Sequence, residues 1–167
     1  LEAVHNQLLQ LPGHQTPPGS NLSYRQTLSR WDMGFDVLAA GTTHQSNQII
    51  ALRMRRKVVE ATLISNARND APGGCIDAHC KTILDLVYQL IKGIQLRVDQ
   101  RGFYLANGLI EALYFVAVKS KDWDLRQQAI DTLRQYRFID GVWGSEAAAD
   151  LAATRLTTDM QVYRQHT

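Results

Sequence analysis

The residues best suited to metal chemistry lie together at Cys75 and Cys80, with Asp77 and His79 between them. Thiolate, imidazole and carboxylate groups bind zinc, but a structural site needs about four ligands, usually from two paired motifs. No second cysteine or histidine pair accompanies this one in the sequence. The favoured interpretation is a helix that starts near Ala78 and is capped by Asp77, so no metal site is predicted.

Catalytic motifs are also missing from the sequence. Nucleophilic catalysis needs a serine or cysteine near a histidine and an orienting carboxylate. The chain has no GxSxG nucleophile elbow and no GxxxxGK[ST] phosphate loop, and none of its five histidines forms an HExxH pair. We therefore predict no catalytic residue and no cofactor, and keep a fragment of an enzyme only as an alternative.

The clearest candidate binding residues form a basic cluster, RMRRK, at residues 53–57. On a helix, Arg53, Arg56 and Lys57 share one face, because residues three and four apart are neighbours. This basic face is a candidate site for an acidic protein partner, and the alternative is a solvated face that pairs with Glu60. With 18 basic and 16 acidic residues and a net charge of +2, the chain is too balanced to indicate nucleic-acid contact, and none is predicted.

Length and composition indicate one globular domain. The chain has 167 residues, of which 45% are hydrophobic and 20% charged, and single domains commonly have about 100–200 residues. We expect one helical domain over residues 1–167, a fragment of a longer protein, with residues 1–21 as a peripheral helix and loop. The two cysteines suit a reducing, intracellular compartment. No apolar run approaches the roughly 18 residues of a membrane span, so no membrane contact is predicted.

Apolar residues recur at helical spacing through most of the chain, and no segment alternates with period two for long enough to predict a strand. One helix is expected over about residues 22–40, followed by others that carry the basic cluster and the segment after Ala78. Asp122 is the predicted N-cap of a later helix. The pattern predicts an all-α fold of six or seven antiparallel helices packed as hairpins.

The segment from about residue 105 to 120 has almost no polar face. A helix that is apolar all round is buried on all sides, and this one is too short to span a bilayer. We expect it to be the central helix of the bundle. A small-molecule effector pocket beside it, lined by Tyr114, Phe115 and Trp143, is a second hypothesis. The alternative role for Trp143 is to pack on the turn between the last two helices.

Residues 113–122, LYFVAVKSKD, are followed by an arginine-rich helix at 126–134 and by DGVWG at 140–144. This order resembles the C-terminal regulatory region of fungal binuclear zinc-cluster (six-cysteine) transcription factors. The earlier WDMGF at 31–35 is similar to an aromatic helix of that family. The chain departs from the family pattern at Ala112, Ser120 and Gly144, where the family often has proline, cysteine and aspartate.

The resemblance implies a non-catalytic regulatory domain of a fungal transcription regulator that acts through protein–protein contacts. It also implies a nuclear location and a protein partner, with a small-molecule effector as the alternative ligand. The six cysteines of the DNA-binding cluster are not in this sequence. The expected mechanism is a rigid helical scaffold whose exposed grooves bind a partner helix.

Overall fold

The fold is all-α, as the sequence predicts. The computed structural model describes residues 20–40, 47–66, 74–95, 108–136, 139–140 and 143–166. Within these ranges it contains six helices and two strands of two residues each. The peripheral helix that was predicted within residues 1–21 lies outside the described residues.

The first three described helices form where the sequence predicts helices. They are α2 (Ser20–Ala40), α3 (Asn47–Asn66) and α4 (Gly74–Gln95). In α3 the side facing the bundle buries Ile50, Met54 and Val58. The predicted boundaries were less accurate, because α2 begins two residues early and α4 begins at Gly74, four residues before the expected start.

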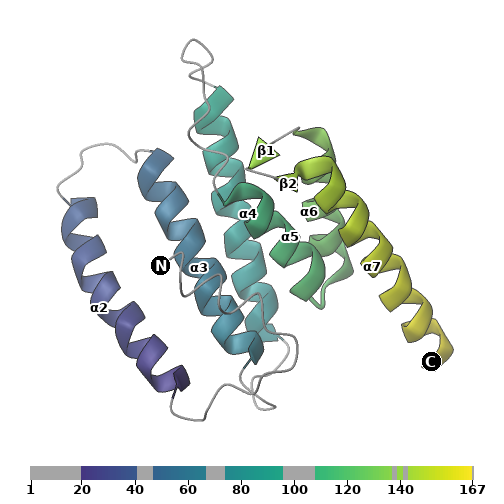
Figure 1. Cartoon of the computed structure of the whole chain (residues 1–167), viewed down its shortest axis with the longest axis horizontal. Helices are drawn as coiled ribbons and strands as arrows, with labels where there is room; N and C mark the ends of the chain where they lie inside the picture. The colour runs from purple at the N-terminus through teal and green to yellow at the C-terminus, as the bar shows by residue number, and fades with distance from the viewer. Residues whose placement is uncertain are drawn as a thin grey trace.

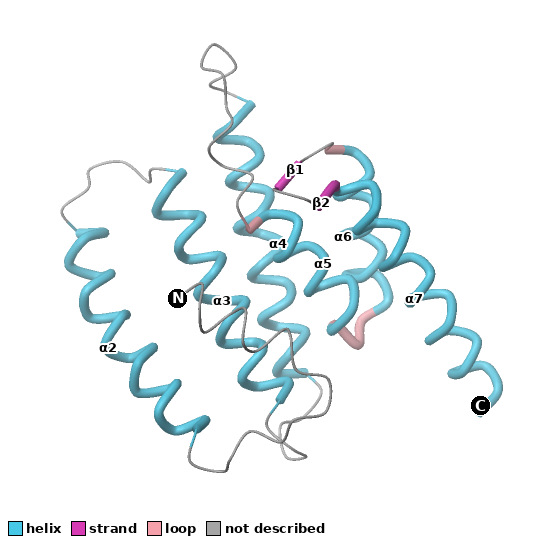
Figure 2. Tube along the Cα trace, in the orientation of Figure 1, coloured by secondary structure: helices cyan, strands magenta, loops and turns pink. Residues whose placement is uncertain are grey.

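The remaining helices are α5 (Leu109–Lys119), α6 (Trp123–Gln135) and α7 (Ser145–His166). In Figure 1, α2, α3 and α4 lie in sequence order across one part of the molecule, and α7 forms the opposite edge. The tube in Figure 2 follows the same path and shows how little of the described chain is not helical. Consecutive helices pack against each other from α3 to α7.

Helix α5 is the most enclosed helix, as its sequence indicates. It contacts α3, α4, α6 and α7. Seven of its eleven residues are buried: Leu109, Ile110, Ala112, Leu113, Phe115, Val116 and Ala117. Burying this much apolar surface is the main source of stability for the bundle. Among the described residues, no helix combines the length and apolar character needed to cross a bilayer.

Gly108 and Asp122 mark the starts of α5 and α6. Gly108 precedes α5 with a φ of 99°, a left-handed conformation that glycine adopts without steric cost. Asp122 caps α6 as predicted, because its carboxylate accepts hydrogen bonds from the backbone N–H groups of Asp124 at 2.8 Å and Leu125 at 3.3 Å.

A buried arginine ties α5, α6 and α7 together. Arg126 is 4% exposed, and its Nε donates to the carbonyl of Ala117 at 2.7 Å. That carbonyl lies in the last turn of α5, where carbonyls lack helical partners. The Nη2 of Arg126 donates to Asp159 of α7 at 2.8 Å, and its guanidinium lies 5.1 Å from the ring centroid of Trp123.

The connection between α6 and α7 contains the only strands among the described residues, and the sequence did not predict them. Strand β1 (Ile139–Asp140) pairs antiparallel with β2 (Trp143–Gly144), and Asp140 lies opposite Trp143. Two residues per strand are too few to produce a period-two pattern, so the sequence signal was that of a turn.

Candidate functional site

The three residues of the predicted basic face do share one side of α3, and α2 lies beside that side. Arg53, Arg56 and Lys57 are each half-buried. With Asp32 and Phe35 of α2 and two residues of α4, Thr82 and Leu86, they line an open groove of about 410 Å³. We call this the basic groove.

Arg56 makes the strongest polar contact in the basic groove. Its Nε and Nη2 donate to the two carboxylate oxygens of Asp32, the latter at 2.6 Å. This two-pronged geometry is the preferred way in which a guanidinium binds a carboxylate. Arg56 also donates from Nη1 to Glu60 at 3.2 Å, and Lys57 donates to the same carboxylate at 3.0 Å. The predicted pairing of this face with Glu60 is therefore confirmed.

Aromatic side chains of α2 complete the basic groove. The guanidinium of Arg53 lies 5.6 Å from the ring centroid of Phe35, within the range of a cation–π interaction. Trp31 stacks on Phe35 with 4.8 Å between ring centroids and an angle of 10° between the planes. The basic groove thus has guanidinium groups that bind carboxylates and that also pack on aromatic rings.

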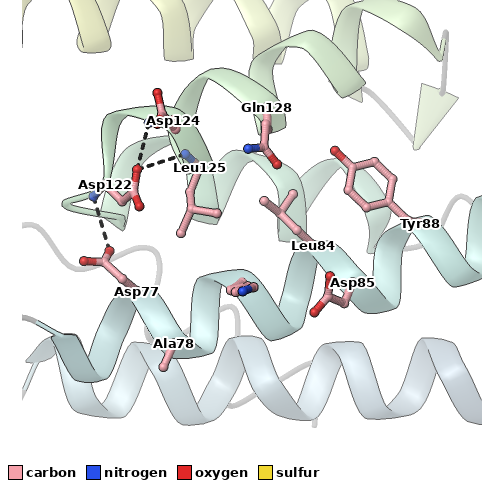
Figure 3. A pocket seen from close by; sticks show the side chains of 10 residues that line it. Asp77, Ala78, Leu84, Asp85, Tyr88, Asp122, Asp124, Leu125 and Gln128 are labelled. Atoms are coloured by element: carbon pink, nitrogen blue, oxygen red, sulfur yellow. Dashed lines mark hydrogen bonds between the residues drawn. The ribbon is translucent and has the colours of Figure 1, made fainter.

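A second open groove, of about 480 Å³, runs between α4 and α6 and is shown in Figure 3. Carboxylates and apolar side chains dominate its lining: Asp77, Ala78, Lys81, Leu84, Asp85, Tyr88, Asp122, Asp124, Leu125 and Gln128. Two of its carboxylates already serve the fold, since Asp122 caps α6 and Asp77 binds the α5–α6 connection. The roles of Asp77 and Asp122 in the fold therefore account for part of the acidic character of this groove.

The prediction that Asp77 caps its own helix is wrong. Because α4 begins at Gly74, Asp77 lies in its first turn and points toward the connection between α5 and α6 (Figure 3). Its Oδ1 accepts hydrogen bonds from the Ser120 hydroxyl at 2.7 Å and from the Lys121 backbone N–H at 2.8 Å. Those donors lie outside any helix, so a carboxylate from α4 supplies the acceptor that they would otherwise lack.

The cysteine region forms no disulfide at Cys80, which is a free, buried thiol. Burial raises the pKa of this thiol to about 12, and the charge of Asp77 adds to the shift, while a hydrogen bond with Ser120 opposes it. Among the described residues, no group of three histidine, cysteine, aspartate or glutamate side chains is placed to hold a metal ion. Cys80 is thus a core thiol held in its neutral form.

The predicted effector pocket involves Tyr114, Phe115 and Trp143. Phe115 belongs to the buried core, and Tyr114 packs against that core from a half-buried position. Trp143 lies in β2, but its side chain is not among those described. Neither the basic groove nor the α4–α6 groove includes these residues, so a pocket beside α5 stays a prediction.

Sequence reasoning missed the contribution of α2 to the basic groove. Trp31 and Phe35 lie four residues apart on the predicted helix of residues 22–40, a spacing that indicates a buried stripe. Phe35 is indeed buried, but it packs outside the main core, beneath Arg53. The available signal was the acidic residue beside that stripe, which places a carboxylate at the edge of the α2 contact surface.

Comparison with protein-family models, curated proteins and solved structures found no match to this chain. The resemblance to fungal zinc-cluster regulators therefore remains a prediction from the sequence. What the chain can bind has to be argued from the geometry of its grooves.

Proposed function

We propose that this chain is a non-catalytic interaction domain that acts through protein contacts. In this proposal, the basic groove binds an acidic, helical segment of a partner protein. The scaffold is suited to that role because α3 and α4 pack closely against each other and belong to the continuous buried core. Binding to such a scaffold leaves the α3 and α4 walls of the groove in place, which keeps the entropic cost of association low.

The observation that carries the proposal is the contact between Arg56 and Asp32. A guanidinium that is only partly exposed already binds a helical carboxylate in two-pronged geometry at this position. Arg53 provides a cation over an aromatic ring next to it, and Lys57 adds a further positive charge at the edge. Acidic helices with aromatic residues match this arrangement in charge and in shape.

The sequence resemblance extends the proposal to a biological setting. Residues 113–122 and 140–144 support placement of the chain in a fungal zinc-cluster transcription regulator, acting in the nucleus. Two observations test this placement. The encoding gene should specify a six-cysteine cluster in the same protein, and a fluorescent fusion of the full-length protein should accumulate in nuclei. A gene without that cluster and a protein excluded from nuclei would both count against the regulator assignment.

The proposed binding role is tested by cross-linking in cells that express the chain. A carbodiimide activates a carboxylate for attack by a neighbouring lysine amine and is released as a urea, so mass spectrometry should identify a partner peptide joined to Lys57 beside the internal link from Lys57 to Glu60. Charge reversal by Arg53→Glu or Arg56→Glu should weaken binding of that identified partner about tenfold or more, because a close charge pair becomes repulsive.

Lys92→Glu is the matched control, since Lys92 is an exposed cation in the last turn of α4 and does not line the basic groove. It should leave partner binding unchanged. Equal loss of binding in Lys92→Glu and Arg56→Glu would show that general charge, not this groove, drives association. A complete lack of partner cross-links at Lys57 would contradict the proposal directly.

A further inference from the structure

We propose that α2 is a displaceable occupant of the basic groove, and that an acidic helix of a partner binds by taking its place. This inference rests on the proposed function, because both concern the same groove. It adds a mechanism of regulation, in which the chain masks its own binding surface, and it defines the partner helix by the chemistry that α2 already presents.

Among the described residues, α2 contributes less to the main core than the other helices do. None of its described side chains belongs to the buried core, which is built from residues of α3 to α7. Its main neighbour is α3. In Figure 1 it lies at the edge of the molecule, beside α3 and away from α5 to α7. Elements with few buried apolar contacts open at low free-energy cost, so α2 can leave without unfolding the core.

Among the described side chains of α2, two large apolar ones are exposed to solvent. Met33 is 67% exposed and Val37 is 76% exposed, although both are apolar. They lie one helical turn apart and face away from the basic groove. On the groove side of α2, Asp32 and Phe35 line the basic groove, Asp32 binds Arg56, and Trp31 stacks on Phe35.

These α2 residues also specify what could replace the helix. Asp32 accepts hydrogen bonds from Arg56. Phe35, three residues later, lies beneath the guanidinium of Arg53. Trp31, directly before Asp32, stacks on Phe35. A competing helix therefore needs a carboxylate, an aromatic residue directly before it and a second aromatic residue three positions after it. A basic helix would be repelled by Arg53, Arg56 and Lys57, which gives the groove its selectivity.

A peptide with the sequence of residues 20–40 is the probe, labelled with a fluorophore and added to the full chain. Fluorescence anisotropy measures its affinity. Asp32→Asn in the chain weakens the contact of the resident α2 with Arg56. The peptide should therefore bind that variant about tenfold more tightly than wild type, a typical size for the coupling between two competing interactions. Phe35→Ala should act in the same direction. Asp85→Asn, an exposed carboxylate outside the basic groove, should not change the affinity.

Charge exchange locates the binding site. Arg56→Glu in the chain should abolish binding of the normal peptide, and a peptide carrying Asp32→Arg should restore it. Hydrogen exchange on an isotopically labelled chain then tests displacement. Peptide binding should speed the exchange of α2 amides while α3 to α7 keep their protection.

The outcomes separate this inference from the proposed function. Equal affinity of wild type and Asp32→Asn, with loss of binding in Arg56→Glu, would overturn displacement and leave the groove as a binding site. Unchanged protection of α2 on peptide binding would also overturn displacement. Failure of the peptide to bind any variant, including Asp32→Asn and Phe35→Ala, would overturn the proposed function itself.

Discussion

The carboxylate of Asp77 accepts a hydrogen bond from the hydroxyl of Ser120 at 2.7 Å, across a sequence separation of 43 residues. The same oxygen accepts the backbone N–H of Lys121 at 2.8 Å. Asp77 belongs to α4, whereas its donors connect α5 to α6. This one carboxylate therefore fixes the first turn of α4 against the point where the chain reverses direction, and it does so beside the buried thiol of Cys80.

Removing that carboxylate should destabilise the fold. Asp77→Ala leaves the Ser120 hydroxyl and the Lys121 N–H without their acceptor, and we expect the free energy of unfolding to fall by about 1–3 kcal/mol. Urea denaturation followed by circular dichroism measures the change. Asp85→Ala, an exposed carboxylate of the same helix, is the control and should change stability by less than about 0.5 kcal/mol. Similar losses in both variants would show that the contact with Ser120 is unimportant.

The glycine before α5 should not tolerate a side chain. At the φ of 99° of Gly108, a Cβ atom would lie 2.9 Å from Nε of Arg55 in a left-handed backbone conformation. We expect Gly108→Ala to lower the free energy of unfolding by about 1–2 kcal/mol. A thermal melt with unchanged midpoint would contradict this expectation.

Gly34 offers the opposite case within α2. A Cβ there would meet nothing within 4 Å, so alanine gains helix propensity without a clash. Gly34→Ala should stabilise α2 by about 0.5–1 kcal/mol. Slower hydrogen exchange of the α2 amides would report this gain. The added peptide of residues 20–40 should then bind more weakly, because the resident α2 is harder to displace. Faster exchange in α2 would contradict the expected gain.

The thiol of Cys80 should be unreactive in the folded protein. Its pKa is raised from 9.0 to about 12, so almost none of it is thiolate at pH 8, and only the thiolate attacks alkylating reagents. In a Cys75→Ser background, iodoacetamide should label Cys80 only at the rate of unfolding, as mass spectrometry can follow. Rapid labelling under native conditions would contradict burial of the thiol.

The same shift makes stability depend on alkaline pH. Above pH 9 the unfolded chain loses the Cys80 proton while the folded chain retains it, so the unfolded state binds fewer protons. The contribution of Cys80 is therefore fully present below pH 9 and is lost as the pH rises toward about 12. The difference in unfolding free energy between wild type and Cys80→Ala should shrink over that interval, and a constant difference would exclude the effect.

Arg126 should be far more important for stability than other charged residues of α6. Arg126→Leu leaves the Ala117 carbonyl without its donor, while Asp159 keeps its ion pair with Arg155, and we expect a loss of about 1–3 kcal/mol. Arg134→Leu is the control, because Arg134 is 49% exposed and lies 3.4 Å from Asp150. Exposed pairs of this kind contribute about 0.2–1 kcal/mol, so urea denaturation should separate the two variants clearly.

The sequence predicted the helices well because the signal for a helix is local. The apolar run from Leu109 to Val118 indicated an enclosed helix, and α5 is enclosed by four neighbours. Asp122 was assigned as an N-cap from its position alone, and it caps α6. Boundaries next to glycine-rich segments were less accurate, as the early start of α4 at Gly74 illustrates, since glycine permits a helix as well as a turn.

The candidate site was predicted only in part. Arg53, Arg56 and Lys57 were grouped correctly, because spacings of three and four residues on one helix bring side chains together. Their most important neighbours, Asp32 and Phe35, belong to another helix and were not assigned to the site. No local pattern states which face of α2 meets which turn of α3.

Residue types and their spacing were thus enough to establish an all-α chain with an enclosed apolar helix and a basic face, because these properties depend on contacts within one or two helical turns. Packing decided the rest. Arg56 meets Asp32 across 24 residues, and Ser120 meets Asp77 across 43. Hydrogen bonds act over about 3 Å and in narrow directions, so such pairs form only once the helices have taken their relative positions.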